Sequence, residues 1–207
     1  MSGKDRDEHG HEHGRIRILD RVTLHKKFLH LQKVTAEHVT VSGGRQVIER
    51  EVHDHGNAAA ILLYDPKRRV TVMVRQLRLP VHLNGDDGWM IEAPAGMLDG
   101  EHPDVAICRE AMEETGFKVE KPRHLFDAYA SPGSLTEKVS FYAAEIDLSV
   151  RAGEGGGHEH EQEDIEVLEI PIAAALEMVT DGRICDAKTI ILLQWAARHY
   201  GIEWPLS

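Results

Sequence analysis

Apolar and polar residues are distributed along the chain in a way that predicts strands mixed with helices. Two apolar runs, at 57–64 and 70–76, are separated by the turn residues Asp65, Pro66 and Lys67, which is typical of a buried β-hairpin. Because strands and helices do not alternate as regular βαβ units, the pattern predicts an α/β fold, an α/β/α sandwich around a mixed sheet. The remaining strands are expected at 89–92, 128–131, 139–146 and 165–170, and the later helices at 171–181 and 187–199.

The chain before this hairpin divides into a tail and a second, strand-rich segment. Residues 1–14 are polar, and their alternating histidines are interpreted as part of a disordered terminus rather than a metal site. Strand-like runs at 30–41 and 46–52 flank a Ser-Gly-Gly turn, so we expect a hairpin-rich segment. The predicted organisation is a tail at 1–14, an N-terminal β segment at 15–52 and one main domain at 53–207.

One helix is predicted with both of its ends marked. Pro103 suits the first helical position because its missing N–H would have no partner there, and Gly116 can adopt the left-handed conformation that ends a helix. The helix is therefore expected to run from Pro103 to Thr115. Its apolar face is expected to pack against the sheet and consists of Val105, Cys108 and Met112.

The other face of this helix carries three carboxylates, Glu110, Glu113 and Glu114. Like charges at this spacing repel one another, and the helix dipole disfavours negative charge near the C-terminus. A divalent cation would remove the conflict, and Mg²⁺ prefers a few carboxylate oxygens completed by water and substrate phosphate. Glu110 and Glu114 are the predicted metal ligands, with Glu113 nearby; the alternative is an acidic surface without a ligand. Arg109 is expected to pair with one of these carboxylates and orient it.

Composition limits the partners of the chain. Its 207 residues are 42% hydrophobic and 29% charged, as in globular proteins, and the formal net charge of −11 argues against nucleic acid and against an anionic membrane surface. No apolar run reaches transmembrane length, and the polar start does not read as a signal peptide. Because Cys108 and Cys185 are the only cysteines, we expect reduced thiols and a cytoplasmic location.

Residues 109–117, REAMEETGF, resemble the second half of the signature of the Nudix hydrolases. Further motifs extend the resemblance over most of 15–197 and, in their order, resemble the GDP-mannose pyrophosphatase branch, a close relative of the ADP-ribose pyrophosphatases. They include RQLRLP, NGDDGWMIEAPAG, SPGSLTEKVSFYAAE and DAKTIILL. The opening glycine of the signature falls on Ala95, with Gly96 one residue later, so the role of the early acidic residue, Glu101, stays open. The resemblance implies the same α/β/α fold.

The resemblance also implies roles for individual residues of the main domain. The backbone carbonyl of Ala95 would contact the metal, and Ala95 and Gly96 would contact the substrate. Arg78 and Lys188 would bind the substrate diphosphate; their alternatives are a surface cation at a strand end and a solvated lysine at a helix start. Glu137 would contact the sugar or a phosphate, and its alternative is a turn residue before the next strand.

A base that activates water is sought in the acidic, glycine-rich loop at 151–164, which we expect to be unordered without a ligand. Glu163 matches the family's functional carboxylate, so it is the predicted base and a further metal ligand, with a purely structural role as the alternative. His158 and His160 are expected to be solvated rather than to bind metal.

Four residues of the N-terminal segment match family positions that contact the nucleotide across a dimer interface: Phe28, Glu49, Arg50 and Glu51. Phe28 would stack on the base, or alternatively belong to the core of its strand. Glu49 or Glu51 could accept hydrogen bonds from N1 and N2 of guanine, which adenine cannot donate, so a GDP substrate is favoured. The resemblance thus implies a homodimer with shared active sites.

The predicted function is hydrolysis of a nucleoside-diphosphate sugar, with Mg²⁺ as cofactor and Mn²⁺ able to substitute. The most specific prediction is cleavage of GDP-mannose to GMP and mannose 1-phosphate. The alternatives are hydrolysis of ADP-ribose to AMP and ribose 5-phosphate, a regulator that binds nucleotide sugars without cleaving them, and a metal-storing protein that uses its histidines. Three mutually repelling carboxylates argue against a regulator, which has no need of them.

Overall fold

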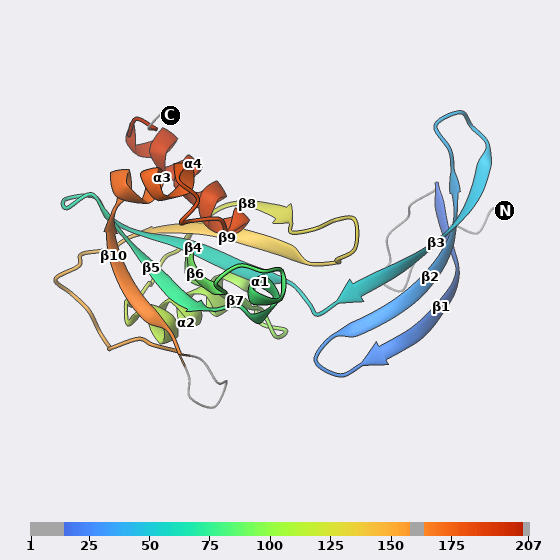
Figure 1. Ribbon diagram of the computed structural model, residues 1–207, viewed down its shortest axis with the longest axis horizontal. Helices are drawn as coiled ribbons and strands as arrows, with labels where there is room; N and C mark the ends of the chain where they lie inside the picture. The colour runs from blue at the N-terminus through green and yellow to red at the C-terminus, as the bar shows by residue number, and fades with distance from the viewer. Residues whose placement is uncertain (1–14, 158–163, 205–207) are drawn as a thin grey trace. The chain divides into compact units, whose positions relative to one another are not determined.

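The computed structural model describes residues 15–157 and 164–204, and it divides the chain into two compact units. The first unit contains the chain up to Asn57 together with Tyr129–Lys138, and the second contains Ala58–Ala128 and the chain from Val139 onward. The predicted tail at 1–14 lies outside the described residues. The elements of both units are labelled in Figure 1.

The first unit is a three-stranded antiparallel sheet with the order β1-β2-β3. The hairpin predicted around the Ser-Gly-Gly turn is confirmed as β2 and β3, but β1 was not predicted. Its pairing with β2 shifts register between Ile18 and Asp20 and between Thr23 and His25. Such irregularities break the period-two alternation by which a strand is recognised in sequence. The strands are β1 (Ile16–Lys26), β2 (His30–Val39) and β3 (Arg45–Asp54).

A seven-stranded mixed sheet forms the second unit. Its main path has the order β10-β5-β4-β9-β8, with β6 beside β5 and β7 beside β4. β4 runs parallel to β9 and antiparallel to β5 and β7, so the predicted mixed sheet is confirmed. The strands are β4 (Ala58–Asp65), β5 (Val70–Leu77), β6 (Trp89–Glu92), β7 (Ala95–Met97), β8 (Arg123–Tyr129), β9 (Lys138–Glu145) and β10 (Glu166–Pro171).

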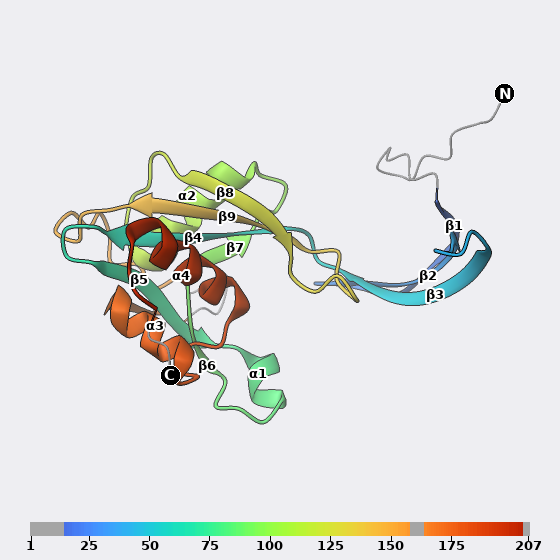
Figure 2. The ribbon, with the colours of Figure 1, turned by 90° about the horizontal axis from the view of Figure 1, so that it is seen from above.

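Helices cover both faces of this sheet, as the predicted α/β/α sandwich requires. Figure 2 shows α2 on one side of the strands and α3 and α4 on the other. A short helix, α1, follows β5. The helices are α1 (Leu79–Leu83), α2 (Pro103–Thr115), α3 (Ile172–Thr180) and α4 (Ala187–Tyr200).

The central strand β4 is buried along its whole length, and its side chains supply both cores. Leu62 and Tyr64 lie in the cluster that includes residues of α3 and α4, whereas Ile61 and Leu63 lie in the cluster that includes residues of α2. This alternation follows from the pleat of a strand, in which successive side chains point to opposite faces. Burial of each large aliphatic side chain contributes roughly 1.5–3 kcal/mol.

Two sequence predictions about these elements are wrong in detail. The buried residues of α2 include Ala106, Ile107 and Ala111, whereas Val105 of the predicted buried face is 55% exposed. Small alanines carry little weight in a hydrophobic pattern, yet they allow the helix to approach the sheet closely. The strand predicted at 128–131 lies earlier, as Arg123–Tyr129.

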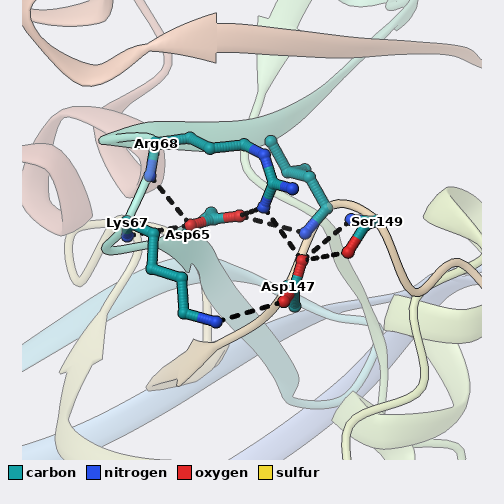
Figure 3. Close-up of polar contacts among 6 residues, drawn as sticks. Asp65, Lys67, Arg68, Asp147 and Ser149 are labelled. Carbon is teal, nitrogen blue, oxygen red and sulfur yellow. Dashed lines mark hydrogen bonds and ion pairs between the residues drawn. The ribbon is translucent and has the colours of Figure 1, made fainter.

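A network of charged side chains fixes the turn after β4 to the segment after β9 (Figure 3). The fully buried carboxylate of Asp65 accepts hydrogen bonds from the backbone N–H groups of Lys67, Arg68 and Leu148, at 2.9, 3.0 and 3.1 Å. Asp147 in turn contacts Lys67, Arg68 and Ser149. The network therefore anchors the chain just before the glycine-rich loop.

Candidate active site

The carboxylates of α2 lie against the backbone of β7. Glu114 is only 2% exposed, and its Oε2 accepts a hydrogen bond from the backbone N–H of Ala95 at 3.1 Å. The carboxyl group of Glu110 lies so close to Gly96 that a Cβ atom built at position 96 would be 2.1 Å from Glu110 Cδ. Two carboxylates one helical turn apart therefore meet the same short stretch of backbone.

Arg109 binds three carboxylates around this point, so the predicted pairing is confirmed. Its guanidinium lies 3.0 Å from Glu110 Oε1, 2.7 Å from Glu113 Oε2 and 3.1 Å from Glu101 Oε2. Partial burial would lower the pKa of Arg109, but the neighbouring carboxylates outweigh it and raise the pKa. The structure thus assigns Glu101 a contact with Arg109.

The donor set fits a hard divalent cation that keeps open coordination positions. Glu110 and Glu114 would hold it together with the carbonyl of Ala95, because carboxylate and carbonyl oxygens are the ligands that Mg²⁺ takes beside water and phosphate. Within 15–157 and 164–204, no three acidic, histidine or cysteine side chains converge as a complete metal centre. Water and substrate oxygens would complete the coordination beyond the oxygens that the protein supplies.

A second charged cluster lies where β5, β6 and α4 meet. The carboxylate of Glu92, which is 2% exposed, accepts two hydrogen bonds from Arg78: from Nε at 2.7 Å and from Nη2 at 3.0 Å. Lys188 Nζ lies 3.7 Å from Glu92 Oε2 and donates to Asp186 Oδ1 at 2.8 Å. The structure therefore brings together Arg78 and Lys188, the two cations predicted to bind a diphosphate.

The electrostatics of this cluster favour the charged forms of Arg78, Lys188 and Asp186. Burial would lower the pKa of Lys188, but the carboxylates of Asp186 and Glu92 more than offset this and raise it. Burial would likewise raise the pKa of Asp186, but Lys188 and Thr189 lower it. The pKa of Arg78 is raised despite burial, chiefly by Glu92 and also by Glu114.

Sequence reasoning missed three members of this cluster. Glu92 interrupts an otherwise apolar strand, and that interruption was the available signal. Asp186 is the N-cap of α4 and accepts from the backbone N–H of Thr189 at 2.9 Å, a pattern readable in the sequence DAKT. The Thr189 hydroxyl accepts a hydrogen bond from the backbone N–H of Ala93, a contact that spacing cannot predict.

The described part of the glycine-rich loop, residues 151–157, lies against the C-terminal end of α2. A helix leaves its last carbonyl groups without partners, and the loop supplies donors for them. Arg151 Nε donates to the carbonyl oxygen of Thr115 at 3.0 Å. Backbone N–H groups make the other bonds, at 2.9–3.1 Å, from Ala152 and Gly153 to Gly116, from Gly156 to Glu114 and from Gly157 to Glu113.

Five predicted site residues belong to the first unit. The side chain of Phe28 is 87% exposed between β1 and β2, so the alternative of a core residue is wrong. Glu49, Arg50 and Glu51 lie on β3, where Glu49 pairs with Lys33 at 3.2 Å. Glu137 is mostly buried, with Oε1 4.0 Å from His55 Nε2.

The predicted base Glu163, with His158 and His160, lies outside the described residues. None of the helices in the described part of the chain has the length and apolarity needed to span a bilayer.

Comparison with known proteins places this geometry in context. A family model described as the NUDIX domain matches residues 54–199. The chain is 46% identical over 184 residues to the GDP-mannose pyrophosphatase of Pectobacterium atrosepticum, covering 87% of this chain and 93% of that protein. It is 46% identical over 178 residues to the enzyme of the same name from Yersinia pestis (86% and 89% covered) and 44% identical to that of Cronobacter sakazakii (86% and 92% covered).

The fold also has a counterpart among solved structures. A crystal structure of an ADP compounds hydrolase matches with a TM-score of 0.69 and 20% identity, over 91% of this chain and 97% of that chain. At this identity the likeness extends to the fold alone.

Proposed function

The chain belongs to the Nudix family, and from that premise we propose that it hydrolyses the diphosphate bond of GDP-mannose, giving GMP and mannose 1-phosphate. The observation that carries the proposal is the meeting of Glu110 and Glu114 at the Ala95–Gly96 backbone. The close similarity to proteins named GDP-mannose pyrophosphatase supports the choice of substrate.

In the proposed reaction, different residues of the second unit bind the diphosphate, position the metal-binding carboxylates and accept a proton. Arg78 and Lys188 bind and orient the diphosphate through directed, charge-assisted hydrogen bonds. Arg109 holds Glu110 and Glu113 in place, while the Ala95 N–H fixes Glu114. Water attacks one phosphorus of the diphosphate, the bond from that phosphorus to the bridging oxygen breaks, and the bridging oxygen leaves with the other phosphate. A carboxylate accepts the proton of the attacking water; we propose Glu163 for this role because it matches the family's functional carboxylate.

We propose Mg²⁺ as the cofactor, with Mn²⁺ able to replace it. When bound, the cation neutralises charge on the diphosphate and makes bound water more acidic. Glu110, Glu114, the Ala95 carbonyl and Glu163 are the proposed protein ligands. All four ligands are oxygen atoms, which hard cations such as Mg²⁺ prefer and soft metals do not.

We further propose that the enzyme is a homodimer in which the first unit of each chain completes the nucleotide site of the other. In the described part of this unit, β1 exposes Ile16, Leu19 and Leu24, at 54, 44 and 47%. Apolar residues gathered on one strand favour a protein partner over solvent. Phe28 would stack on guanine, Glu49 or Glu51 would accept from its N1 and N2 donors, Arg50 would contact the nucleotide, and Glu137 would contact the sugar or a phosphate.

A reducing cytoplasm is the proposed location of the enzyme. Both cysteines are free thiols: Cys108 is half-buried on α2 and Cys185 is exposed before α4. An exposed free thiol is best tolerated where glutathione keeps it reduced.

A substrate panel tests the proposed function. The protein is incubated with Mg²⁺ and GDP-mannose, ADP-ribose, GDP-glucose or UDP-glucose, and both products are identified by chromatography and mass spectrometry. The proposal expects the highest kcat/KM with GDP-mannose and the products GMP and mannose 1-phosphate. A higher kcat/KM with ADP-ribose would identify ADP-ribose as the substrate in place of GDP-mannose. Binding without turnover would favour a regulator that binds nucleotide sugars.

A further inference from the structure

Glu92 is a nearly fully buried carboxylate that contacts both proposed phosphate-binding cations. We propose that Glu92 is a positioning residue that holds Arg78 and Lys188 in a single arrangement, ready for the two phosphates of the substrate. The inference rests on the proposed function, since it assigns the pair a diphosphate ligand.

The geometry of the Arg78 contact supports positioning rather than simple neutralisation. Two parallel hydrogen bonds, through Nε and Nη2, fix both the location and the plane of the guanidinium. These two bonds use Nε and Nη2 and do not involve Nη1, through which the guanidinium could reach a phosphate oxygen. An arginine held by one oxygen alone would rotate about that contact.

Lys188 is held from two sides. Its ammonium group donates to Asp186 at 2.8 Å and lies 3.7 Å from Glu92. The hydroxyl of Thr189 donates to Asp186 at 2.7 Å and accepts from the N–H of Ala93, the residue after Glu92, also at 2.7 Å. The start of α4 is therefore attached to the end of β6, and Lys188 lies at a fixed place beside Glu92.

The charges of this cluster balance, since Arg78 and Lys188 face Glu92 and Asp186. The two half-buried cations therefore need no substrate to be stable beside the buried carboxylate of Glu92. Long cationic side chains lose rotamer freedom when they bind a ligand, and side chains already held in place lose less of it on binding. Glu92 thus affects substrate affinity through the two cations, without contacting the reacting atoms.

Two substitutions at position 92 separate positioning from neutralisation. Glu92→Asp keeps the negative charge but shortens the side chain, whereas Glu92→Gln keeps the shape and removes the charge. Steady-state kinetics with GDP-mannose and Mg²⁺ should show KM raised about tenfold in both variants, equivalent to ~1.4 kcal/mol of binding free energy. The fall in kcat should be smaller, and the Mg²⁺ concentration for half-maximal activity should be unchanged. The matched control is Glu166→Gln, which removes a carboxylate that pairs with Arg75 at 3.3 Å on the same sheet and should leave KM unaltered.

A double-mutant cycle with Arg78→Met provides the second readout. If Glu92 acts through Arg78, Glu92→Gln should raise KM much less in the Arg78→Met background than in the wild type. An equal effect in both backgrounds, or an unchanged KM in Glu92→Asp, would overturn the inference while leaving the proposed function intact. A wild-type protein that cleaves none of the nucleotide sugars would overturn the proposed function and this inference together.

Discussion

The carboxyl group of Glu110 occupies the space that a side chain at position 96 would need. A Cβ atom at Gly96 would lie 2.1 Å from both Cδ and Oε1 of Glu110. The absence of a side chain at position 96 is therefore part of the proposed metal site, because it allows a carboxylate of α2 to reach the backbone of β7.

Gly96→Ala should displace the Glu110 carboxylate and reduce turnover at limiting Mg²⁺ by about 10–100-fold. The fold should survive, because the clashing group is the far end of a flexible side chain. Activity titrated against Mg²⁺ and thermal unfolding together measure both effects. Gly44→Ala is the control, since its nearest neighbour would be 3.4 Å away. Unchanged Mg²⁺ dependence in Gly96→Ala would remove Glu110 from the metal site.

Glu114→Gln should lower turnover by roughly two orders of magnitude or more, because it removes a proposed metal ligand. Its amide oxygen can still accept from the Ala95 N–H, so the midpoint of thermal unfolding should change little. Glu169→Gln, at an exposed position on β10, is the matched control. Near-normal turnover in limiting Mg²⁺ would contradict the assignment of Glu114.

The hydrogen bonds between residues 151–157 and α2 lead to a prediction for amide hydrogen exchange. The N–H groups of Gly156 and Gly157 are bonded to α2, so they should exchange slowly even without metal or substrate. Gly155→Ala should abolish this protection, since φ is +70° and the new Cβ would lie 2.6 Å from the Glu114 carbonyl oxygen. Gly133→Ala, where the Cβ would meet nothing within 4 Å, is the control. Fast exchange in the wild type would show that the loop is not docked.

Asp65 should make stability depend on pH in the acid range. Burial alone would raise its pKa, but hydrogen bonds from Leu148 and Arg68 lower it from 3.8 to about 2. A carboxylate with a lowered pKa stabilises the fold fully above its unfolded pKa, and this contribution is lost as pH falls from 3.8 towards 2. The difference in urea midpoint between wild type and Asp65→Asn should therefore be constant near neutral pH and shrink below about pH 4. A difference that persists at the lowest pH would contradict the lowered pKa.

Shared active sites predict complementation between two inactive chains. Glu114→Gln leaves the first unit intact, and Arg50→Ala leaves the carboxylates of α2 intact. A mixed dimer would contain one site with both parts intact, so mixing should restore activity towards half of the wild-type value per mixed dimer. Subunit exchange is checked with differently tagged chains. Exchanged chains without recovered activity, or a monomer in sedimentation, would reject the shared site.

The sequence predicted the elements whose ends are set by neighbouring residues, such as helix caps and short turns. Pro103 and Gly116 marked both ends of α2, and Gly116 adopts the expected left-handed conformation with φ of 74°. The β4–β5 hairpin was equally readable, because its apolar runs and its turn are contiguous in sequence. Strand β1 was missed because its register against β2 shifts twice, which interrupts the alternation of apolar and polar residues.

Contacts between distant residues account for most of what the sequence did not reveal. Glu92 on β6 joins Arg78, the residue after β5, and Lys188 on α4, and no spacing rule relates residues from three separate parts of the chain. The same holds for the loop at 151–157, whose glycines were interpreted as a source of disorder. In the described part of the loop, the missing side chains of these glycines permit a close approach to α2, which composition alone does not reveal.

The contact between Ala93 and Thr189 spans 96 residues of sequence, and this separation sets an order for the assembly of the site. Arg78 and Glu92 can meet as soon as β5 and β6 pair, early in synthesis. Lys188 joins them only after α4 has been made, and pairings of such long range close late in folding. A chain still emerging from the ribosome therefore has Arg78 in place but not Lys188. The proposed diphosphate-binding pair is complete only when α4 packs against the sheet.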